Sequence, residues 1–289
     1  QEILIQAFSD KELQEVLDEL YLDDAVDIIE EMPANVVKRI LRQTSPEVRK
    51  KINEILHYPE DSAGSIMTIE YVDLKKTMTV DEAFSRIRAT GVDKETIYTC
   101  YVTNHDRKLE GLVTVRELLL SPKTAIIGEI MQTHVIAAST LDDKEKVANQ
   151  LQKYDFLALP VVDQEYRLVG IVTFDDAMDV LQEENTEDIE MMAAITPTGK
   201  PYLKTSTTEL WKKRVPWLLL LMVSATFTGK IIQAYESALA AQVALTAFIP
   251  MLMDTGGNAG SQASVTIIRG LSLGEIRMSD LLKIIWKEI

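Results

Sequence analysis

Charged side chains almost disappear between residues 215 and 268, and this limits the possible folds more than any other feature of the chain. The segment "VPWLLLLMVSATFTG" at 215–229 carries no charge, and Asp254 is the only charged residue from Ser237 to Ile268. A helix of about 20 mostly apolar residues crosses the hydrocarbon core of a bilayer. We therefore predict two membrane spans, near 214–234 and 238–268, of which the second is long enough for its glycines to break it.

Basic side chains flank the two predicted spans at their outer ends. They are Lys212, Lys213 and Arg214 before the first span, and Arg269 and Arg277 after the second. By the positive-inside rule, both outer ends face the cytoplasm. This predicts a multi-pass membrane protein whose N-terminal part is cytoplasmic. The alternative, two buried helices of a soluble domain, does not explain this placement of charge.

The part of the chain before the spans is strongly acidic. Residues 1–200 carry 39 acidic and 21 basic side chains, a net charge of −18, whereas residues 201–289 carry 6 and 9. An acidic surface repels nucleic acid phosphates and attracts cations, so we predict no nucleic acid partner. The single cysteine, Cys100, excludes an intramolecular disulfide framework and fits a reducing cytosol.

Two neighbouring segments in the middle of the chain repeat each other. The segment "KLEGLVTVRELLLS" at 108–121 matches "RLVGIVTFDDAMDVL" at 167–181, and the segments upstream of both also match. Each copy predicts a β-α-β-β-α unit. The copies resemble a CBS pair (a Bateman module), with I-M near the start of each unit and G-h-h-T-x-x-[DE] near its end. We place the units at 61–125 and 126–182.

The resemblance to a CBS pair implies two clefts that often hold adenosine nucleotides. In each unit, the motif's Thr and the acid three residues later can present acceptors to a ribose, at a helix N-terminus that favours phosphate. For Thr173 and Asp176, the alternative is that they only cap the helix that follows. We hypothesise that ATP occupies the first cleft near Arg116, Glu117 and Phe156, with contacts to phosphate, ribose and base, respectively.

The remaining segments complete a multidomain α-helical and α/β organisation. Apolar residues at helical spacing, with "MP" at 32–33 and "SP" at 45–46 at helix starts, predict a partial α-helical superhelix as the N-terminal domain, at 1–60. A long acidic connecting (plug) helix region is predicted at 183–213 and a partial transmembrane domain at 214–289. The sequence contains no G-x-S-x-G, H-E-x-x-H, P-loop or Cys/His metal cluster, so we predict no enzymatic activity.

The order of these parts resembles the MgtE-type magnesium transport proteins. The segments "YPEDSAG" at 58–64, "EENTEDI" at 183–189 and "TGGNAGSQ" at 255–262 carry the resemblance, which extends over essentially the whole chain. It implies a Mg²⁺-selective channel of the inner or plasma membrane that is a homodimer through its CBS pair and its membrane helices. It also implies a membrane part of five helices, of which this sequence would contain the first two.

The resemblance further implies which carboxylates sense intracellular Mg²⁺. Mg²⁺ prefers oxygen ligands and retains several waters, so one or two carboxylates per site are enough. The matching positions are Asp23, Asp27, Asp143, Glu145, Asp155, Asp176, Asp179, Glu184, Glu187 and Asp188. Bound ions would bridge the domains and close the pore, whereas without ions the acids repel one another. The alternative is that these acids are only a solvated surface.

The polar residues inside the second apolar segment need a separate explanation. Gly256 and Gly260 form a G-x-x-x-G pattern, which allows close helix packing in membranes. Asp254, Asn258 and Gln262 recur every four residues and share one helical face. Polar groups in a membrane are costly unless they face a bundle interior or water, so we predict that this stripe lines the path of a hydrated cation. For Asp254, attraction of ions and capping of a helix break are both open.

Two other classes of protein are alternatives to a Mg²⁺-sensing channel. One is a CBS-based nucleotide-sensing regulatory module of another membrane transporter, and the other is a CBS-regulated enzyme tethered to a membrane. An enzyme would need a catalytic constellation, which the sequence lacks outside the CBS pair. Chloride and amino-acid transporters usually place the CBS pair after the membrane helices, whereas here it precedes them.

Overall fold

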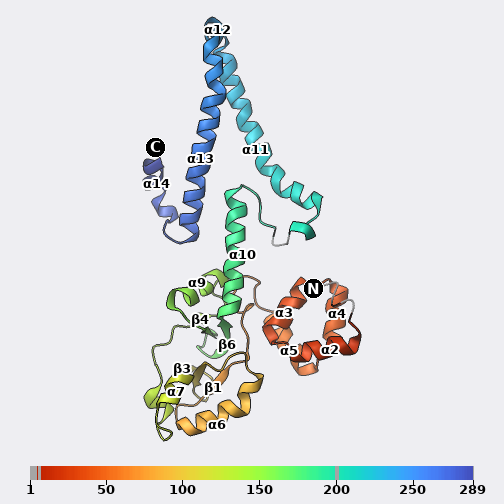
Figure 1. Ribbon diagram of the computed structural model, residues 1–289, viewed down its shortest axis with the longest axis vertical. Helices are drawn as coiled ribbons and strands as arrows, with labels where there is room; N and C mark the ends of the chain where they lie inside the picture. The colour runs from red at the N-terminus through yellow and green to blue at the C-terminus, as the bar shows by residue number, and fades with distance from the viewer. Residues whose placement is uncertain (1–4, 6–7, 199–201, 289) are drawn as a thin grey trace. The chain divides into compact units, whose positions relative to one another are not determined.

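The computed structural model describes residue 5 and residues 8–198 and 202–288. The chain divides into two compact units, Gln1–Leu181 and Gln182–Ile289. The first contains the N-terminal helices and the CBS pair, and the second contains the long apolar helices (Figure 1). The predicted N-terminal domain and connecting region include residues 1–4, 6–7 and 199–201, which lie outside the described residues.

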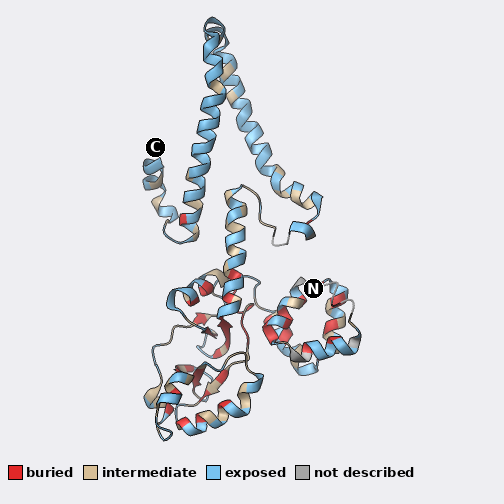
Figure 2. Cartoon of the chain, in the orientation of Figure 1, coloured by how far each residue is buried: buried red, intermediate tan, exposed pale blue. Residues whose placement is uncertain are grey.

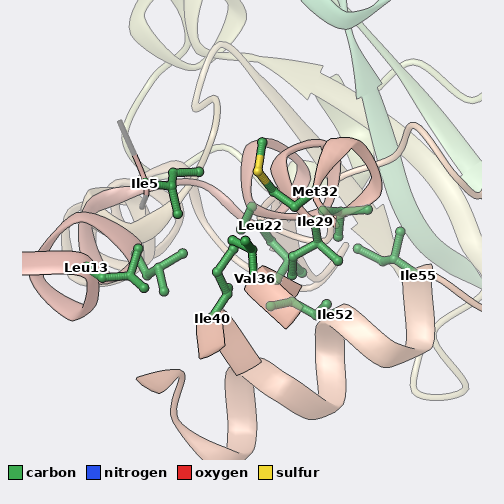
Figure 3. Packing of buried hydrophobic residues seen from close by; sticks show 12 residues of the cluster. Ile5, Leu13, Leu22, Ile29, Met32, Val36, Ile40, Ile52 and Ile55 are labelled. Atoms are coloured by element: carbon green, nitrogen blue, oxygen red, sulfur yellow. The ribbon is translucent and has the colours of Figure 1, made fainter. Parts of the chain in front are cut away.

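Short helices follow one another in the N-terminal part. Ser9 caps the first described helix through a capping box with Glu12, and Ser45 caps the last with Pro46 in its first turn. The helices are α2 (Asp10–Glu19), α3 (Leu22–Glu31), α4 (Ala34–Gln43) and α5 (Pro46–Ile55). Their Leu, Ile, Val and Met side chains meet in one core (Figure 3). This confirms the predicted helical N-terminal domain.

Each CBS unit forms a three-stranded sheet with the same topology. In the orders β1-β2-β3 and β4-β5-β6, the first pair of strands is parallel and the second antiparallel. The antiparallel register shifts at equivalent places, Val102/Thr103 and Val161/Val162, so the sequence repeat is also a structural repeat. The first unit contains β1 (Val72–Leu74), α6 (Val80–Thr90), η1 (Gly91–Asp93), β2 (Thr99–Thr103), β3 (Leu109–Thr114) and α7 (Val115–Leu120). The second contains α8 (Ile127–Ile130), β4 (Ala138–Ser139), α9 (Lys144–Tyr154), β5 (Ala158–Val162) and β6 (Leu168–Thr173).

The start of each CBS unit packs on the other unit. A Cβ atom on Gly170 of β6 would lie 2.6 Å from Sδ of Met67, which stands at the start of the first unit. The backbone of Thr68 exchanges two hydrogen bonds of 2.8 Å with β6. In the same way, a Cβ on Gly111 of β3 would lie 2.9 Å from Sδ of Met131. The methionine of each I-M motif therefore fits the glycine of the other unit's G-h-h-T motif.

We expect Gly170→Ala to lower the free energy of unfolding of the compact unit Gln1–Leu181 by about 1–3 kcal/mol. The added methyl group overpacks a close contact with backbone as well as side-chain atoms. The nearest backbone atom, the carbonyl oxygen of Thr68, would lie 2.8 Å from the new Cβ. Gly91→Ala is the matched control, since its Cβ would meet only the side chains of Ile97 and Ile87, at 3.0 Å or more. Urea unfolding followed by circular dichroism measures both. Equal midpoints for the two variants would contradict the close packing of Gly170.

The last helix of the CBS pair is also the connecting helix. Helix α10 (Phe174–Met192) begins directly after β6 and continues past residue 182, where the second CBS unit was predicted to end. The acidic helix predicted from residue 183 is thus the C-terminal half of α10. The helix ends before Ala194, whose φ of 55° is left-handed. The boundary between the two compact units therefore lies inside one continuous helix.

Helix α11 (Thr207–Ala234) contains the first predicted span and begins before it. Among the described residues it is the one helix that is long and apolar enough to cross a membrane by length and composition. Its apolar side chains are exposed along the chain (Figure 2). Such a surface is expected to face lipid or other helices.

The second predicted span is broken, although not at its glycines. Helix α12 (Glu236–Ala241) and the 3₁₀ helix η3 (Val243–Ala247) precede α13 (Phe248–Ser272), and the backbone leaves the helical conformation at Gln242. Gly256 and Gly260 lie inside the uninterrupted α13, so the expectation that glycines break this segment is wrong. Each glycine destabilises the helix by about 1 kcal/mol relative to alanine, and the hydrogen bonds of the 25-residue helix outweigh this. The remaining short elements are η2 (Tyr202–Lys204), η4 (Met278–Asp280) and α14 (Leu281–Glu288).

Candidate functional site

A buried carboxylate stands at the start of α3, on the side of the CBS pair. Asp23 lies in the first turn of α3 and is 8% exposed. The N-cap residue Tyr21 makes no side-chain cap, and the N–H of Leu22 instead donates to Oε2 of Glu70 at 3.4 Å. Free N–H groups and the helix dipole favour acidic side chains at a helix N-terminus. The start of α3 therefore gathers Asp23, Asp24 and Glu70.

Carboxylates of the CBS pair act on the same place. Burial, followed by the charges of Asp176 and Glu95, raises the pKa of Asp23 to about 8. Burial and the charges of Asp175 and Asp176 raise the pKa of Glu95 to about 7. Burial also raises the pKa of Asp176 to about 6, although the hydroxyl of Thr173 donates to this carboxylate and opposes the change. The charges with the largest effects on all three pKa values belong to other carboxylates.

Glu95 is the member of this group that sequence reasoning missed most clearly. It follows η1 in a loop, and its N–H donates to the carbonyl oxygen of Glu70 at 2.9 Å. Its Oε2 atom is buried and has no hydrogen-bond partner within the described part of the chain. A buried acceptor without a donor costs about 1–3 kcal/mol. We call the following residues the acid cluster: Asp23, Asp24, Glu70, Glu95, Asp175 and Asp176.

The acid cluster fits a hydrated divalent cation better than a dehydrated one. Across residues 8–198 and 202–288, no three His, Cys, Asp or Glu side chains stand close enough to form a ready-made metal site. Mg²⁺ retains several of its waters and takes only one or two carboxylates directly. A hydrated Mg²⁺ ion can therefore bridge acids that are too far apart to chelate it together. It would place a positive charge beside Asp23, Glu95 and Asp176, whose pKa values neighbouring carboxylates raise.

The other predicted sensing residues of the compact unit Gln1–Leu181 lie outside the acid cluster. Asp143 caps α9 and accepts hydrogen bonds from two N–H groups of its first turn at 2.9 and 3.3 Å, and Glu145 lies in that turn. Asp155 ends the same helix with a left-handed φ of 54°. Asp27 and Asp179 are exposed on α3 and α10. Of the predicted residues, the structure brings Asp23 and Asp176 together.

The predicted acids of the connecting segment lie on the second half of α10. Glu184, Glu187 and Asp188 are all partly exposed. Asp188 forms an ion pair with Arg269 of α13, with an N–O distance of 3.5 Å. This carboxylate is therefore paired with a basic residue, whereas neighbouring carboxylates act on Asp23, Glu95 and Asp176 of the cluster.

The residues proposed for a nucleotide belong to different CBS units. Oε2 of Glu117 accepts a hydrogen bond of 2.7 Å from the N–H of Thr114, and Oε1 accepts one of 2.8 Å from Nε2 of Gln132. Thr114 and Glu117 form a capping box. Arg116 is exposed on α7, whereas Phe156 packs against the core of the second unit. A ribose at Glu117 would have to replace these hydrogen bonds.

The polar stripe of the membrane part lies on the continuous helix α13. Nδ2 of Asn258 donates to Oδ2 of Asp254 at 3.4 Å, which places both side chains on one face. Asp254 is inside the helix and not at a break, so the capping alternative for Asp254 is wrong. A Cβ on Gly256 or Gly260 would meet no atom within 4 Å, so this surface has room for another helix.

The fold thus combines a helical domain that shares an acid cluster with a CBS pair and, after them, long apolar helices, which is the organisation of a multidomain membrane protein. Residues 1–61 match the MgtE intracellular N domain, residues 63–122 and 127–183 match the CBS domain, and residues 249–289 match the MgtE divalent cation transporter domain. The chain belongs to the MgtE family.

Known relatives support this assignment over most of the chain. The magnesium transporter MgtE of Thermus thermophilus is 39% identical over 93% of this chain and 60% of its own length. MgtE of Bacillus subtilis is 36% identical over 92% of this chain and 58% of its own length. A crystal structure of the cytosolic domain of the Mg²⁺ channel MgtE in complex with ATP is 38% identical, with a TM-score of 0.56, and covers 61% of this chain and 77% of that one. The chain thus spans about three fifths of the transporters that it matches, which are named as transporters and not as enzymes.

Proposed function

We propose that this chain forms the sensing part and the first membrane helices of a Mg²⁺ channel in which cytoplasmic Mg²⁺ closes the pore. The observation that carries the proposal is the acid cluster, in which buried Asp23 faces the charges of Asp176 and Glu95. The names of its relatives, magnesium transporters, agree with this function.

Repulsion within the acid cluster supplies the two states that such a sensor needs. Without a cation, the N-terminal domain and the CBS pair can reduce the repulsion only by separating or by taking up protons. With Mg²⁺, the same carboxylates become shared ligands, so the ion binds the closed arrangement better than the separated one. A ligand shifts an equilibrium by its difference in affinity for the two states. Helix α10 (Phe174–Met192) has Asp175 and Asp176 of the cluster in its first turn and continues into the acidic connecting segment, so we propose that it transmits the change.

Calorimetry tests the proposed cation site directly. The chain in detergent micelles is titrated with MgCl₂ and, at matched ionic strength, with KCl. We expect saturable heat for Mg²⁺ in the millimolar range and none for K⁺, since hard carboxylate oxygens suit Mg²⁺. Heat that is the same for both salts would reject a specific site. A CaCl₂ arm then measures selectivity.

For the membrane part, we propose a multi-pass protein of the cell membrane with cytoplasmic N-terminal domains, assembled as a homodimer. The basic residues at the outer ends of the spans support this orientation, and the open face around Gly256 and Gly260 supports close helix packing. Asp254, Asn258 and Gln262 would line the ion path, because the stripe that they form is the polar face of α13.

We expect Asn258→Ala to reduce Mg²⁺ flux through the transporter that carries this chain while leaving the dimer assembled, because it removes an amide that can hold the waters of the ion. Gly260→Leu should instead reduce the dimer fraction, because a bulky side chain blocks close approach of a helix. Uptake into liposomes and the dimer fraction in detergent measure the two effects. Normal flux in Asn258→Ala would remove this residue from the path.

We also propose ATP as the nucleotide of the CBS pair, which the ATP complex of the relative at 38% identity supports. Glu117 and Arg116 are the residues that we propose to contact the ribose and the phosphates in the first cleft. Calorimetry with ATP should give saturable heat in the wild type and weaker binding in Arg116→Gln. Equal binding by both would place the nucleotide elsewhere.

A further inference from the structure

A polar joint connects α10 with the end of α13 inside the second unit. Nη1 of Arg269 donates to Oδ1 of Asn185 at 3.2 Å and to Oδ2 of Asp188 at 3.5 Å. The hydroxyl of Ser272 donates to the same oxygen of Asp188. The side chain of Asp188 is 18% exposed and that of Arg269 is 46% exposed. Two donors from α13 thus meet one carboxylate oxygen of α10, at a site where Asp188 is mostly buried and Arg269 is partly exposed.

The spacing of these residues explains why they meet. Asn185 and Asp188 are three residues apart on α10, and Arg269 and Ser272 are three residues apart on α13, so each pair shares one face of its helix. Arg269 also lies in the last turn of α13, where the helix dipole favours a cation. Each helix therefore presents two matched polar groups to the other.

The end of α13 that carries the donors is followed by a tight turn. Gly274 has a φ of +68°, which favours glycine, and its N–H donates to the carbonyl oxygen of Leu271 at 3.0 Å. The N–H of Ile276 donates to the carbonyl oxygen of Gly270 at 2.9 Å, and a Cβ on Gly270 would lie only 2.5 Å from Cδ1 of Ile276. The chain therefore turns back tightly at the helix end that carries Arg269 and Ser272.

We propose that Arg269 and Ser272 act as an internal counter-ligand for Asp188. They hold this carboxylate while the connecting half of α10 carries no divalent cation, and a cation that binds Asp188 has to displace them. The inference rests on the proposed function, since it takes α10 to be a cation-binding helix. When Mg²⁺ replaces the guanidinium of Arg269, the charge of Asp188 stays neutralised. The contact between α10 and α13, the helix with the polar stripe, is then lost. Arg269 is thus a positioning residue that couples the sensor to the pore helix.

Pulsed electron paramagnetic resonance on the transporter in nanodiscs tests the joint without measuring transport. Spin labels at Thr186→Cys and Leu273→Cys, both exposed positions, report the distance between α10 and the end of α13. In the wild type we expect a narrow distance distribution without Mg²⁺ that changes as Mg²⁺ is added. In Arg269→Gln we expect a broad distribution without Mg²⁺ and a titration midpoint lower by up to about fivefold, the upper limit for an exposed ion pair. Arg277→Gln, with the same loss of charge outside the joint, should behave like the wild type.

A charge exchange adds a second criterion. The double variant Asp188→Arg with Arg269→Asp should restore the narrow distribution without Mg²⁺ but lose its response to Mg²⁺ at this joint, since the carboxylate has moved to α13. A wild-type distribution and midpoint in Arg269→Gln would overturn the proposal, as would failure of the double variant to restore the distance.

A second label pair separates this inference from the proposed function. Labels at Lys38→Cys on α4 and Lys153→Cys on α9 report on the N-terminal domain and the CBS pair, and the native Cys100 is buried. If this pair responds to Mg²⁺ while the joint does not, the counter-ligand is wrong and the sensor stands. If neither pair responds in the wild type, the proposed function fails and the joint with it.

Discussion

Replacing Asp23 by asparagine is expected to raise the free energy of unfolding of the compact unit Gln1–Leu181, without Mg²⁺ and at pH 7, by an amount on the order of 3 kcal/mol. The pKa of about 8 shows that an ionised Asp23 is costly in the folded chain, because it is buried beside the charges of Asp176 and Glu95. The uncharged amide removes that cost. For the same reason the variant has less to gain from a cation, so the stabilisation by saturating Mg²⁺ should fall to less than half of the wild-type value.

Thermal unfolding in EDTA and in Mg²⁺ measures both quantities for Asp23→Asn. The matched control is Glu47→Gln, which removes a carboxylate from the first turn of α5 in the same domain, at an exposed position. We expect its unfolding temperatures to stay close to the wild type without Mg²⁺. Destabilisation of Asp23→Asn in EDTA would mean that the carboxylate has a partner that stabilises it, which would contradict the repulsive cluster.

The second large effect concerns pH. In Mg²⁺-free buffer, the stability of the first unit should fall as the pH rises from about 4 to about 8. The pKa values of Asp23, Glu95 and Asp176 in the folded chain are about 8, 7 and 6, all above their ordinary values of 3.8 to 4.5. Between these limits the folded state binds more protons than the unfolded state, so the free energy of unfolding decreases with rising pH.

Mg²⁺ should flatten this dependence, because it takes over the neutralisation that protons provide at low pH. Carboxylates whose pKa is lowered in the folded chain change the stability in a lower pH range and do not affect this test. The pKa of Asp142 is lowered by hydrogen bonds from Lys146 and Ser139, so its stabilising contribution disappears only when the pH falls through the acid range. Urea unfolding at several pH values with EDTA or Mg²⁺ measures the slopes. Stability that rises between pH 6 and pH 8 in EDTA would contradict the account.

Patterns with a local cause were predictable from the sequence. Helix starts at Ser45 and Pro46, and the repeated strands of the CBS pair, follow from capping, apolar spacing and turn residues that act within a few positions of each other. The break in the second apolar segment was misplaced, because glycine was given more weight than the backbone change at Gln242. The exchange of I-M segments between the CBS units depends on tertiary packing and has no local signal.

The same distinction holds for the acid cluster. Asp23 and Asp176 came from a resemblance, and the structure places them together. Glu95 was missed because an acid in a loop after a helix is indistinguishable in sequence from a solvated one. Burial of its side-chain oxygen depends on tertiary packing, which brings the starts of α3 and α10 beside it. The tie between Asp188 and Arg269 was missed for a similar reason, since 81 positions separate these residues.

The central claim is that Mg²⁺ closes the N-terminal domain onto the CBS pair through the acid cluster. The most direct test is the distance between spin labels at Lys38→Cys and Lys153→Cys as Mg²⁺ is titrated at constant ionic strength. We predict a long, broad distribution in EDTA that becomes shorter and narrower in millimolar Mg²⁺, and in Asp23→Asn a short distribution that changes little. A wild-type distance that is the same with and without Mg²⁺ would contradict the claim.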